Sequence, residues 1–168
     1  TPLIKFQACR DNIRVATAAM EVRGGNGFIE DWDNARLVRD AHTGVLWEGP
    51  SSIIALDVIR RVIPGEIAPR ALDHALRLKL EAAEEMPASL AGRLLKGWQG
   101  ALAFAREVAA DPAAESYARQ ATGRLYHAVT AILMACEGLA MGQTGGDARR
   151  MLLAQLVLDH RLRASEPQ

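Results

Sequence analysis

The sequence ARQATGRLYHAVTAILMACEGLAM, residues 118–141, gives the clearest indication of the fold. Its small and apolar side chains recur at intervals of three and four residues, which places them on one face of a helix. Because many of them are alanines, a neighbouring helix can approach closely along that face. We therefore predict an all-α fold, a helical bundle with a central seam. The seam residues are Ala118, Ala121, Leu125, Ala128, Ile132, Ala135 and Leu139.

Glycines and prolines divide the rest of the chain into further helices. Ala and Leu dominate the segments between these breaks, and only 5% of the residues are aromatic, a composition typical of packed helices. A turn is expected around Gly44, and Pro64-Gly65 forms the clearest internal boundary. The sequence thus predicts two units, residues 1–63 and residues 66–168, the second packed on the first. The expected helices are 2–22, 33–41, 52–62, 66–85, 87–110, 112–141 and 147–164.

Bulk charge and cysteine content narrow the function classes. Lys and Arg together number 20, as do Asp and Glu, so a net charge of zero indicates neither a nucleic-acid nor a membrane partner. No apolar run is expected to be long enough to span a bilayer. Cys9 and Cys136 are far apart and the 4 histidines lack ligand spacing, so we expect no disulfide and no metal site. This pattern favours a reduced, cytoplasmic compartment.

A glycine-rich segment follows the first expected helix. Gly24, Gly25 and Gly27, with Asn26 among them, would let backbone N–H groups approach a phosphate closely. Glycines that simply end a helix give the same pattern. The spacing is not GxGxxG and no strand precedes it, which excludes a Rossmann-type dinucleotide site.

Glu48 is the second candidate for chemistry, since it lies beside Trp47 after an apolar run. A carboxylate against an aromatic wall has its pKa raised by desolvation, which suits a general base near neutral pH. The alternative is a carboxylate that caps the helix beginning near Ser51. Residue type and spacing alone favour the cap.

The order of these elements resembles the C-terminal helical domain of acyl-CoA dehydrogenases. GGNGF at 24–28 is followed by Glu30-Asp31, Arg39-Asp40-Ala41 and WEG at 47–49, a composite far more specific than any one piece. The resemblance implies that Glu48 removes the α-proton of an acyl-CoA thioester while FAD accepts the β-hydride. It also implies a cofactor-binding role near FAD, often the FAD of a neighbouring subunit, for Gly24, Gly25, Asn26, Gly27, Pro50 and Ser51.

Two positions depart from the family pattern. Glu21 stands where the family often has Gln before the glycine-rich loop, and a carboxylate there would repel a pyrophosphate. Pro50 stands where Thr or Ser usually follows the Glu-Gly pair. Proline has neither a hydroxyl nor a backbone N–H, so one hydrogen bond to flavin would be missing.

The helices after Pro64, together with WEG and LDVIRR at 56–61, look like the AidB-like branch of the family. That likeness raises a second hypothesis, an alkylation-response DNA-binding flavoprotein, and a third is a non-catalytic oligomerisation domain. The charges after residue 65 are balanced, and the one small basic cluster is Arg149-Arg150 with Arg161 and Arg163. Solvated helix faces explain such a cluster equally well, so the sequence gives DNA binding little support.

The resemblance also sets expectations for partners. It implies an acyl-CoA substrate, FAD in the full-length protein, a homo-oligomer and an electron-transfer flavoprotein as a candidate acceptor. Family members build their pockets with an N-terminal helical domain and a middle β-domain, for which 168 residues leave no room. We therefore expect the isolated chain to be inactive. The sequence gives no indication of the length of the acyl chain in the substrate.

Overall fold

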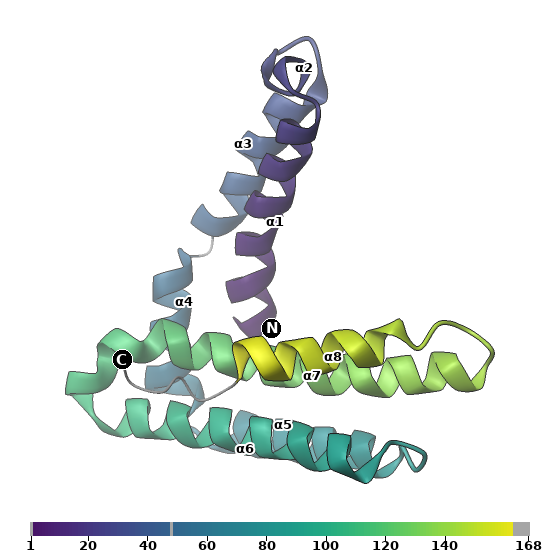
Figure 1. Cartoon of the computed structure of the whole chain (residues 1–168). Helices are drawn as coiled ribbons and strands as arrows, with labels where there is room; N and C mark the ends of the chain where they lie inside the picture. Colours follow the sequence, from purple (N-terminus) through teal and green to yellow (C-terminus); the bar gives the residue numbers. More distant parts are fainter. Residues whose placement is uncertain (1, 48, 163–168) are drawn as a thin grey trace.

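The chain folds into helices, and the part described by the computed structural model, residues 2–47 and 49–162, contains no strand. The predicted all-α fold is confirmed. Figure 1 shows two regions: a pair of long helices that projects outward, and a bundle of helices that lies across its foot. We call residues 2–46 the arm and residues 67–161 the bundle.

The arm is an antiparallel helix pair. α1 (Pro2–Val22) runs outward, the short α2 (Gly25–Phe28) forms the tip, and α3 (Asp33–Leu46) returns (Figure 1). At the tip, a Cβ on Gly27 would overlap the backbone carbonyl of Met20. Glycine is therefore needed for α2 to fold back against the end of α1.

A connecting helix joins the arm to the bundle. α4 (Ser51–Asp57) continues into a π-helical turn, Val58–Val62, in which the Ile63 amide donates to the Val58 carbonyl at 2.9 Å. Ala55, Val58 and Ile59 are fully buried against bundle helices. One hydrophobic core therefore spans the Pro64-Gly65 boundary.

The bundle consists of α5 (Ile67–Glu81), α6 (Ala88–Ala110), α7 (Ala118–Gln143) and α8 (Arg149–Arg161), with a 3-10 helix, Pro112–Tyr117, ahead of α7. The predicted seam on α7 is confirmed, because every member except the half-buried Leu139 is buried. At Gly138, a Cβ would lie 2.7 Å from the Met151 amide nitrogen, so the missing side chain allows α8 to pack closely on α7.

Trp98 anchors the bundle. Its side chain is 1% exposed, and its indole Nε1 donates to Asp73 Oδ1 at 2.8 Å. Asp73 also accepts from Arg77 at 2.8 Å. These contacts, with that of Arg77 the larger, lower the pKa of Asp73. The buried indole N–H is thus satisfied by a carboxylate that α5 holds in place.

Several element boundaries differ from prediction. The turn expected at Gly44 is wrong, because α3 continues through it to Leu46. Gly44 lies against α1, where Lys5 donates to its carbonyl and a Cβ would stand 3.5 Å from Cys9 Sγ. The helix expected over 66–85 ends at Glu81. The helix expected from residue 112 begins with a 3-10 turn that Asp111 caps by accepting from the Ala113 amide.

The prediction that no apolar run could span a bilayer is wrong, because one helix is long and apolar enough to do so. Pro112–Gln143 has an 18-residue window of mean hydropathy 1.3, and 33% of that window is buried in the structure. The buried side chains are those of the α7 seam, which meets neighbouring helices. A core helix of a soluble bundle meets the same criterion, so the finding alone is weak evidence for a membrane segment.

Candidate functional site

The two segments that the sequence singles out lie at opposite ends of α3. The glycine-rich loop is at the tip of the arm, and residues 47–51 are at the junction with α4 (Figure 1). α3 contains 14 residues, so the two segments are about 20 Å apart at 1.5 Å per helical residue. They cannot both contact the same atom of a ligand.

At the tip, the glycines fall into two kinds. Gly24 has φ +58, and neither it nor Gly25 has any atom within 4 Å of an added Cβ, although the Gly24 amide already donates to the Glu21 carbonyl at 2.9 Å. Asn26 is exposed. Gly27 is buried, and the close approach to Met20 already accounts for it. The geometry thus leaves Gly24 and Gly25 as the positions where a ligand can reach the backbone.

Exposed ion pairs surround the tip. Arg39 donates to both oxygens of Glu30, at 2.6 and 3.0 Å, and Arg36 donates to Asp33 at 3.0 Å. Both arginines of α3 near the tip are therefore paired with carboxylates. The hydrogen bond from Arg39 lowers the pKa of Glu30. Glu21, the departure from the family pattern, is exposed.

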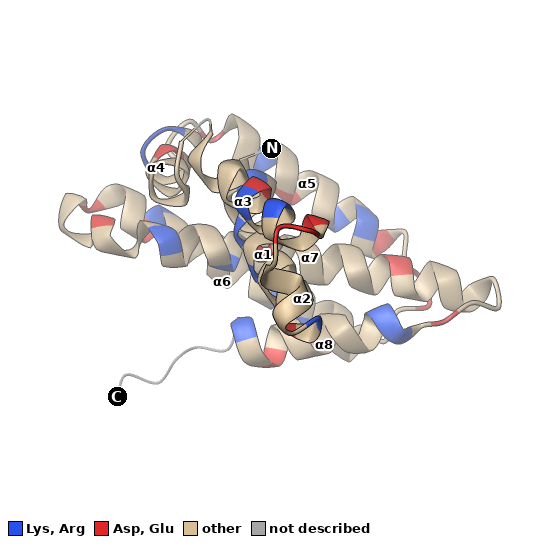
Figure 2. Ribbon diagram, turned by 90° about the horizontal axis from the view of Figure 1, so that it is seen from above, with Lys and Arg blue, Asp and Glu red and all other residues tan. Residues whose placement is uncertain are grey.

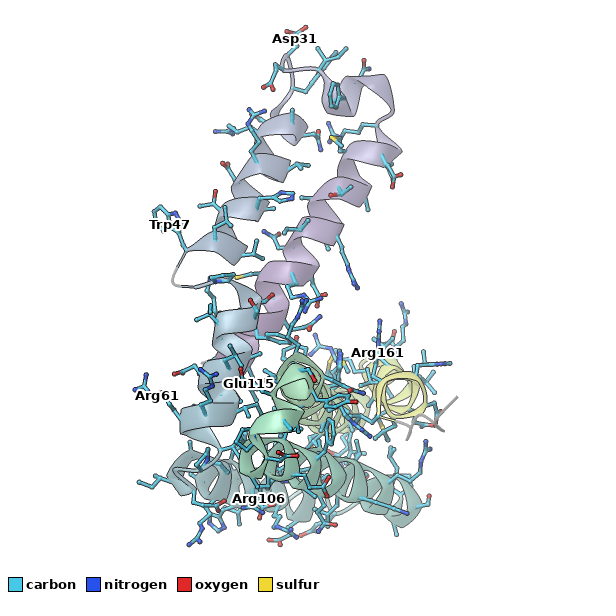
Figure 3. All side chains as sticks on the ribbon, turned by 90° about the vertical axis from the view of Figure 1, so that its left-hand side faces the viewer. Asp31, Trp47, Arg61, Arg106, Glu115 and Arg161 are labelled. Carbon is cyan, nitrogen blue, oxygen red and sulfur yellow. The ribbon has the colours of Figure 1, made fainter. Side chains whose placement is uncertain are left out.

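At the junction, Glu48 lies outside the described residues, but its neighbours are placed. Gly49 has φ +99, a conformation that favours glycine and that separates α3 from α4. Pro50 precedes the first turn of α4, and the half-buried Ser51 begins it. The pattern predicts an enclosing apolar wall, yet Trp47 is 72% exposed and points outward in Figure 3. Within this chain, Trp47 does not supply that wall.

Two arginines of the small basic cluster near the C-terminus are paired with carboxylates. Arg149 pairs with Asp147 at 2.7 Å, and Arg150 pairs with Glu137. Arg163 lies outside the described residues. Arg161 instead lines a cavity with arginines of α1 and α7, which sequence reasoning missed because those residues are far apart along the chain. No cluster of His, Cys, Asp or Glu suited to a metal ion occurs in residues 2–47 and 49–162.

Family comparison identifies the first part of the chain. Residues 1–63 match the family model for the acyl-CoA dehydrogenase C-terminal domain. This segment comprises the arm, the junction and the helix that enters the bundle, and it contains both candidate segments. Residues 1–63 therefore belong to the acyl-CoA dehydrogenase family as part of its C-terminal helical domain.

Three curated relatives refine that placement. The chain is 40% identical over 60 residues to putative acyl-CoA dehydrogenase AidB of Escherichia coli (strain K12), covering 36% of this chain and 11% of the relative. It is 35% identical over 60 residues to acyl-CoA dehydrogenase family member 11 of Caenorhabditis elegans, covering 36% and 10%. It is 31% identical over 113 residues to 3-methylmercaptopropionyl-CoA dehydrogenase of Ruegeria pomeroyi (strain ATCC 700808 / DSM 15171 / DSS-3), covering 67% and 18%.

The three matches differ in how much of this chain they cover. The match to the Ruegeria pomeroyi protein is longer than residues 1–63, so it reaches into the helices after Pro64. The chain spans between about a tenth and a fifth of the length of the curated relatives it matches. No solved structure matches the chain.

Proposed function

We propose that this chain is part of an FAD-dependent acyl-CoA dehydrogenase, which removes hydrogens from the α and β carbons of an acyl-CoA thioester. The observation that carries the proposal is the family match over residues 1–63, which includes both GGNGF and WEG. The names of the relatives support the same reaction class. We also propose that the chain divides at Pro64-Gly65 into the dehydrogenase segment, residues 1–63, and a helical extension, residues 66–168.

Glu48 is the proposed proton-abstracting base. Its carboxylate takes the α-proton of the thioester, and the bound FAD supplies the acceptor for the β-hydride. Gly49, with φ +99, follows Glu48 in the sequence, and Pro50 precedes α4, which begins at Ser51. Trp47 and Leu46 are largely exposed, so these two neighbours do not supply the desolvation that would raise the pKa of a base here.

The glycine-rich loop is the proposed contact to the adenine-dinucleotide part of FAD. No side chain obstructs an approaching pyrophosphate at Gly24 and Gly25. The Gly24 amide already donates to the Glu21 carbonyl, so the support for this contact is steric at that position. Asn26 is exposed within the loop, and Gly27 fixes the fold of the loop. The separation of about 20 Å from the junction supports a loop and a base that serve different FAD molecules, or different ends of one. Pro50 and Ser51 would lie near the flavin.

Assembly is a second proposed role, and the arm favours it. Several large apolar side chains of α1 and α3 are exposed, including Val15 at 66% and Leu37 at 50%. Such faces mark contacts with further protein. We therefore propose a homo-oligomeric parent in the cytoplasm, with an electron-transfer flavoprotein as its electron acceptor. DNA binding gains nothing from Arg149 and Arg150, whose charges are paired.

The test compares the full-length parent with its Glu48→Gln variant. Under anaerobic conditions, an acyl-CoA should bleach the flavin band of the parent but leave that of the variant intact, with FAD content unchanged. Glu84→Gln, an exposed carboxylate in the bundle, removes the same charge far from the junction and should bleach normally. Bleaching of the Glu48→Gln protein at the parent rate would contradict the assignment. The 168-residue chain alone is expected to be inactive.

A further inference from the structure

Fifteen of the sixteen arginines in the described part of the chain fall into two groups, and the exception is Arg23 on the arm. In residues 2–47 and 49–162, ten arginines each form an ion pair with a carboxylate. None of those ten lines the cavity between α1, α7 and α8, which is lined instead by Arg10, Arg14, Arg119, Arg124 and Arg161. Within the described part of the chain, the arginines of the cavity have no carboxylate partner.

The cavity lies where the foot of the arm meets the bundle. Figure 2, which looks down the arm, shows α1 over α7 with α8 beside them. Figure 3 shows Arg161 at the end of α8, on the side from which the arm rises. The cavity has a volume of about 370 Å³, and its walls come from three helices that are distant in sequence. It is therefore a feature of the fold and not of one helix face.

Two of the guanidinium groups are held in place by aromatic rings. Arg10 lies over the Phe6 ring, 5.4 Å from its centroid, and Arg124 lies 5.3 Å from the centroid of Phe104. Arg124 also donates to the Leu162 carbonyl at 3.4 Å. Stacking leaves the edge of a guanidinium free to donate, so these contacts pre-organise donors without neutralising their charge.

The electrostatics of the cavity favour the binding of an anion. Its five arginines and the single carboxylate of Asp11 leave four positive charges with the histidines neutral. The pKa of Arg10 is lowered by burial and then by repulsion from Arg119 and Arg14. The pKa of His127 is lowered by burial and then by Arg161, although Asp11 opposes this. Positive groups thus destabilise one another, which a bound anion would relieve.

We propose that this cavity binds a multiply charged phosphate group, such as the pyrophosphate of a small phosphorylated ligand. Arginine forks match the oxygens of phosphate in pairs, and the convergence of three helices suits a compact group better than an extended duplex. The ligand would connect α1 of the dehydrogenase segment to α7 and α8 of the bundle. The proposal concerns residues other than Glu48 and the glycine-rich loop, so it stands or falls apart from the proposed reaction.

Calorimetric titration of the 168-residue chain with inorganic pyrophosphate tests the proposal. Saturable binding with one site per chain is expected at low ionic strength, and it should weaken as salt screens the charges. Arg119→Gln should weaken binding about tenfold, as expected for loss of a charge-assisted hydrogen bond. Because Arg119 is exposed, its replacement should leave the fold intact, and thermal melting checks this.

Two further variants make the test specific. Asp11→Asn removes the negative charge from the wall, can still accept the bond that Gln7 donates at 2.8 Å, and should tighten pyrophosphate binding. Arg61→Gln removes one charge from an arginine that is 82% exposed and lies outside the cavity, and should bind as the parent does. Equal binding by Arg119→Gln and Arg61→Gln would overturn the proposal. So would binding of duplex DNA that depends on Arg119 when pyrophosphate does not bind.

Discussion

The arm and the bundle bury their apolar residues to very different extents. The bundle encloses a continuous core around Trp98 and the α7 seam, which Phe6 from the foot of the arm joins. Further out along the arm, the described residues include the buried Ala35 and Ala41 but expose many larger side chains. The exposed large apolar residues of the arm are Ile4, Val15, Val22, Phe28, Ile29, Trp32, Leu37 and Leu46.

This difference shows which part of the chain forms its own core. The bundle helices bury apolar residues against one another. α1 and α3 pack together along one face, and other parts of their surface have no neighbour within residues 2–47 and 49–162. The arm is also the part that carries the family match and the glycine-rich loop. The exposed apolar face of the arm therefore fits the proposed contacts with further protein, and substitutions in the two regions test this contrast.

The largest effect is expected from Trp98→Ala. This substitution empties a fully buried site and removes the hydrogen bond to Asp73, so the free energy of unfolding should fall by about 3–5 kcal/mol. Val22→Ala in the arm, where the side chain is 88% exposed, should change it by less than about 0.5 kcal/mol. Urea denaturation followed by circular dichroism measures both. Equal losses would show that the arm is as well packed as the bundle.

Gly138→Ala should give the next largest effect. Its Cβ would meet the Met151 backbone at 2.7 Å, so α8 must move away from α7, at a cost of about 1–3 kcal/mol. Gly92→Ala is the matched control, since it is also within a helix and no atom lies within 4 Å of the added Cβ. That control should stabilise the protein by about 0.5–1 kcal/mol. A neutral Gly138→Ala would contradict the close packing of the two helices.

A smaller, pH-dependent effect is expected from His127. Burial and Arg161 lower its pKa below the ordinary 6.5, so the unfolded chain binds more protons than the folded chain below that pH. The stability that His127 contributes should be complete above pH 6.5 and lost as the pH falls below it. His127→Gln should reduce this loss, as thermal melts across that range would reveal. An unchanged pH profile would contradict the lowered pKa.

The smallest effect is expected for the ion pair at the tip of the arm. Arg39→Ala removes the bond to Glu30, but both side chains are exposed, at 60% and 69%, and solvent screens the pair. The urea midpoint should stay within experimental error of the parent value. A clear loss of stability would mean that the tip is more rigid than its exposure indicates.

The sequence predicts local periodicity well and distant neighbours poorly. The α7 seam and the end of α1 follow from side-chain spacing and from glycines that stop a helix. The continuation of α3 through Gly44 was missed, because the contacts with Lys5 and Cys9 on α1 that hold it come from far along the chain.

The candidate site divides in the same way. The composite GGNGF and WEG pattern is local and identifies the family segment. The arginine-lined cavity draws Arg10, Arg119 and Arg161 from three helices, and no spacing rule connects them. The apolar residues before Glu48 in the sequence predict a carboxylate in an apolar environment, yet Trp47 is exposed. Hydrophobicity alone does not specify which partner covers a side chain.

The most direct test of the central claim is the visible spectrum of the purified full-length parent before and after addition of a panel of acyl-CoAs. If the parent is an acyl-CoA dehydrogenase, one class of thioester should bleach its flavin band, which would also identify the substrate class. A parent that holds no flavin, or whose flavin no acyl-CoA reduces, would contradict the dehydrogenase assignment and favour the assembly role of the arm.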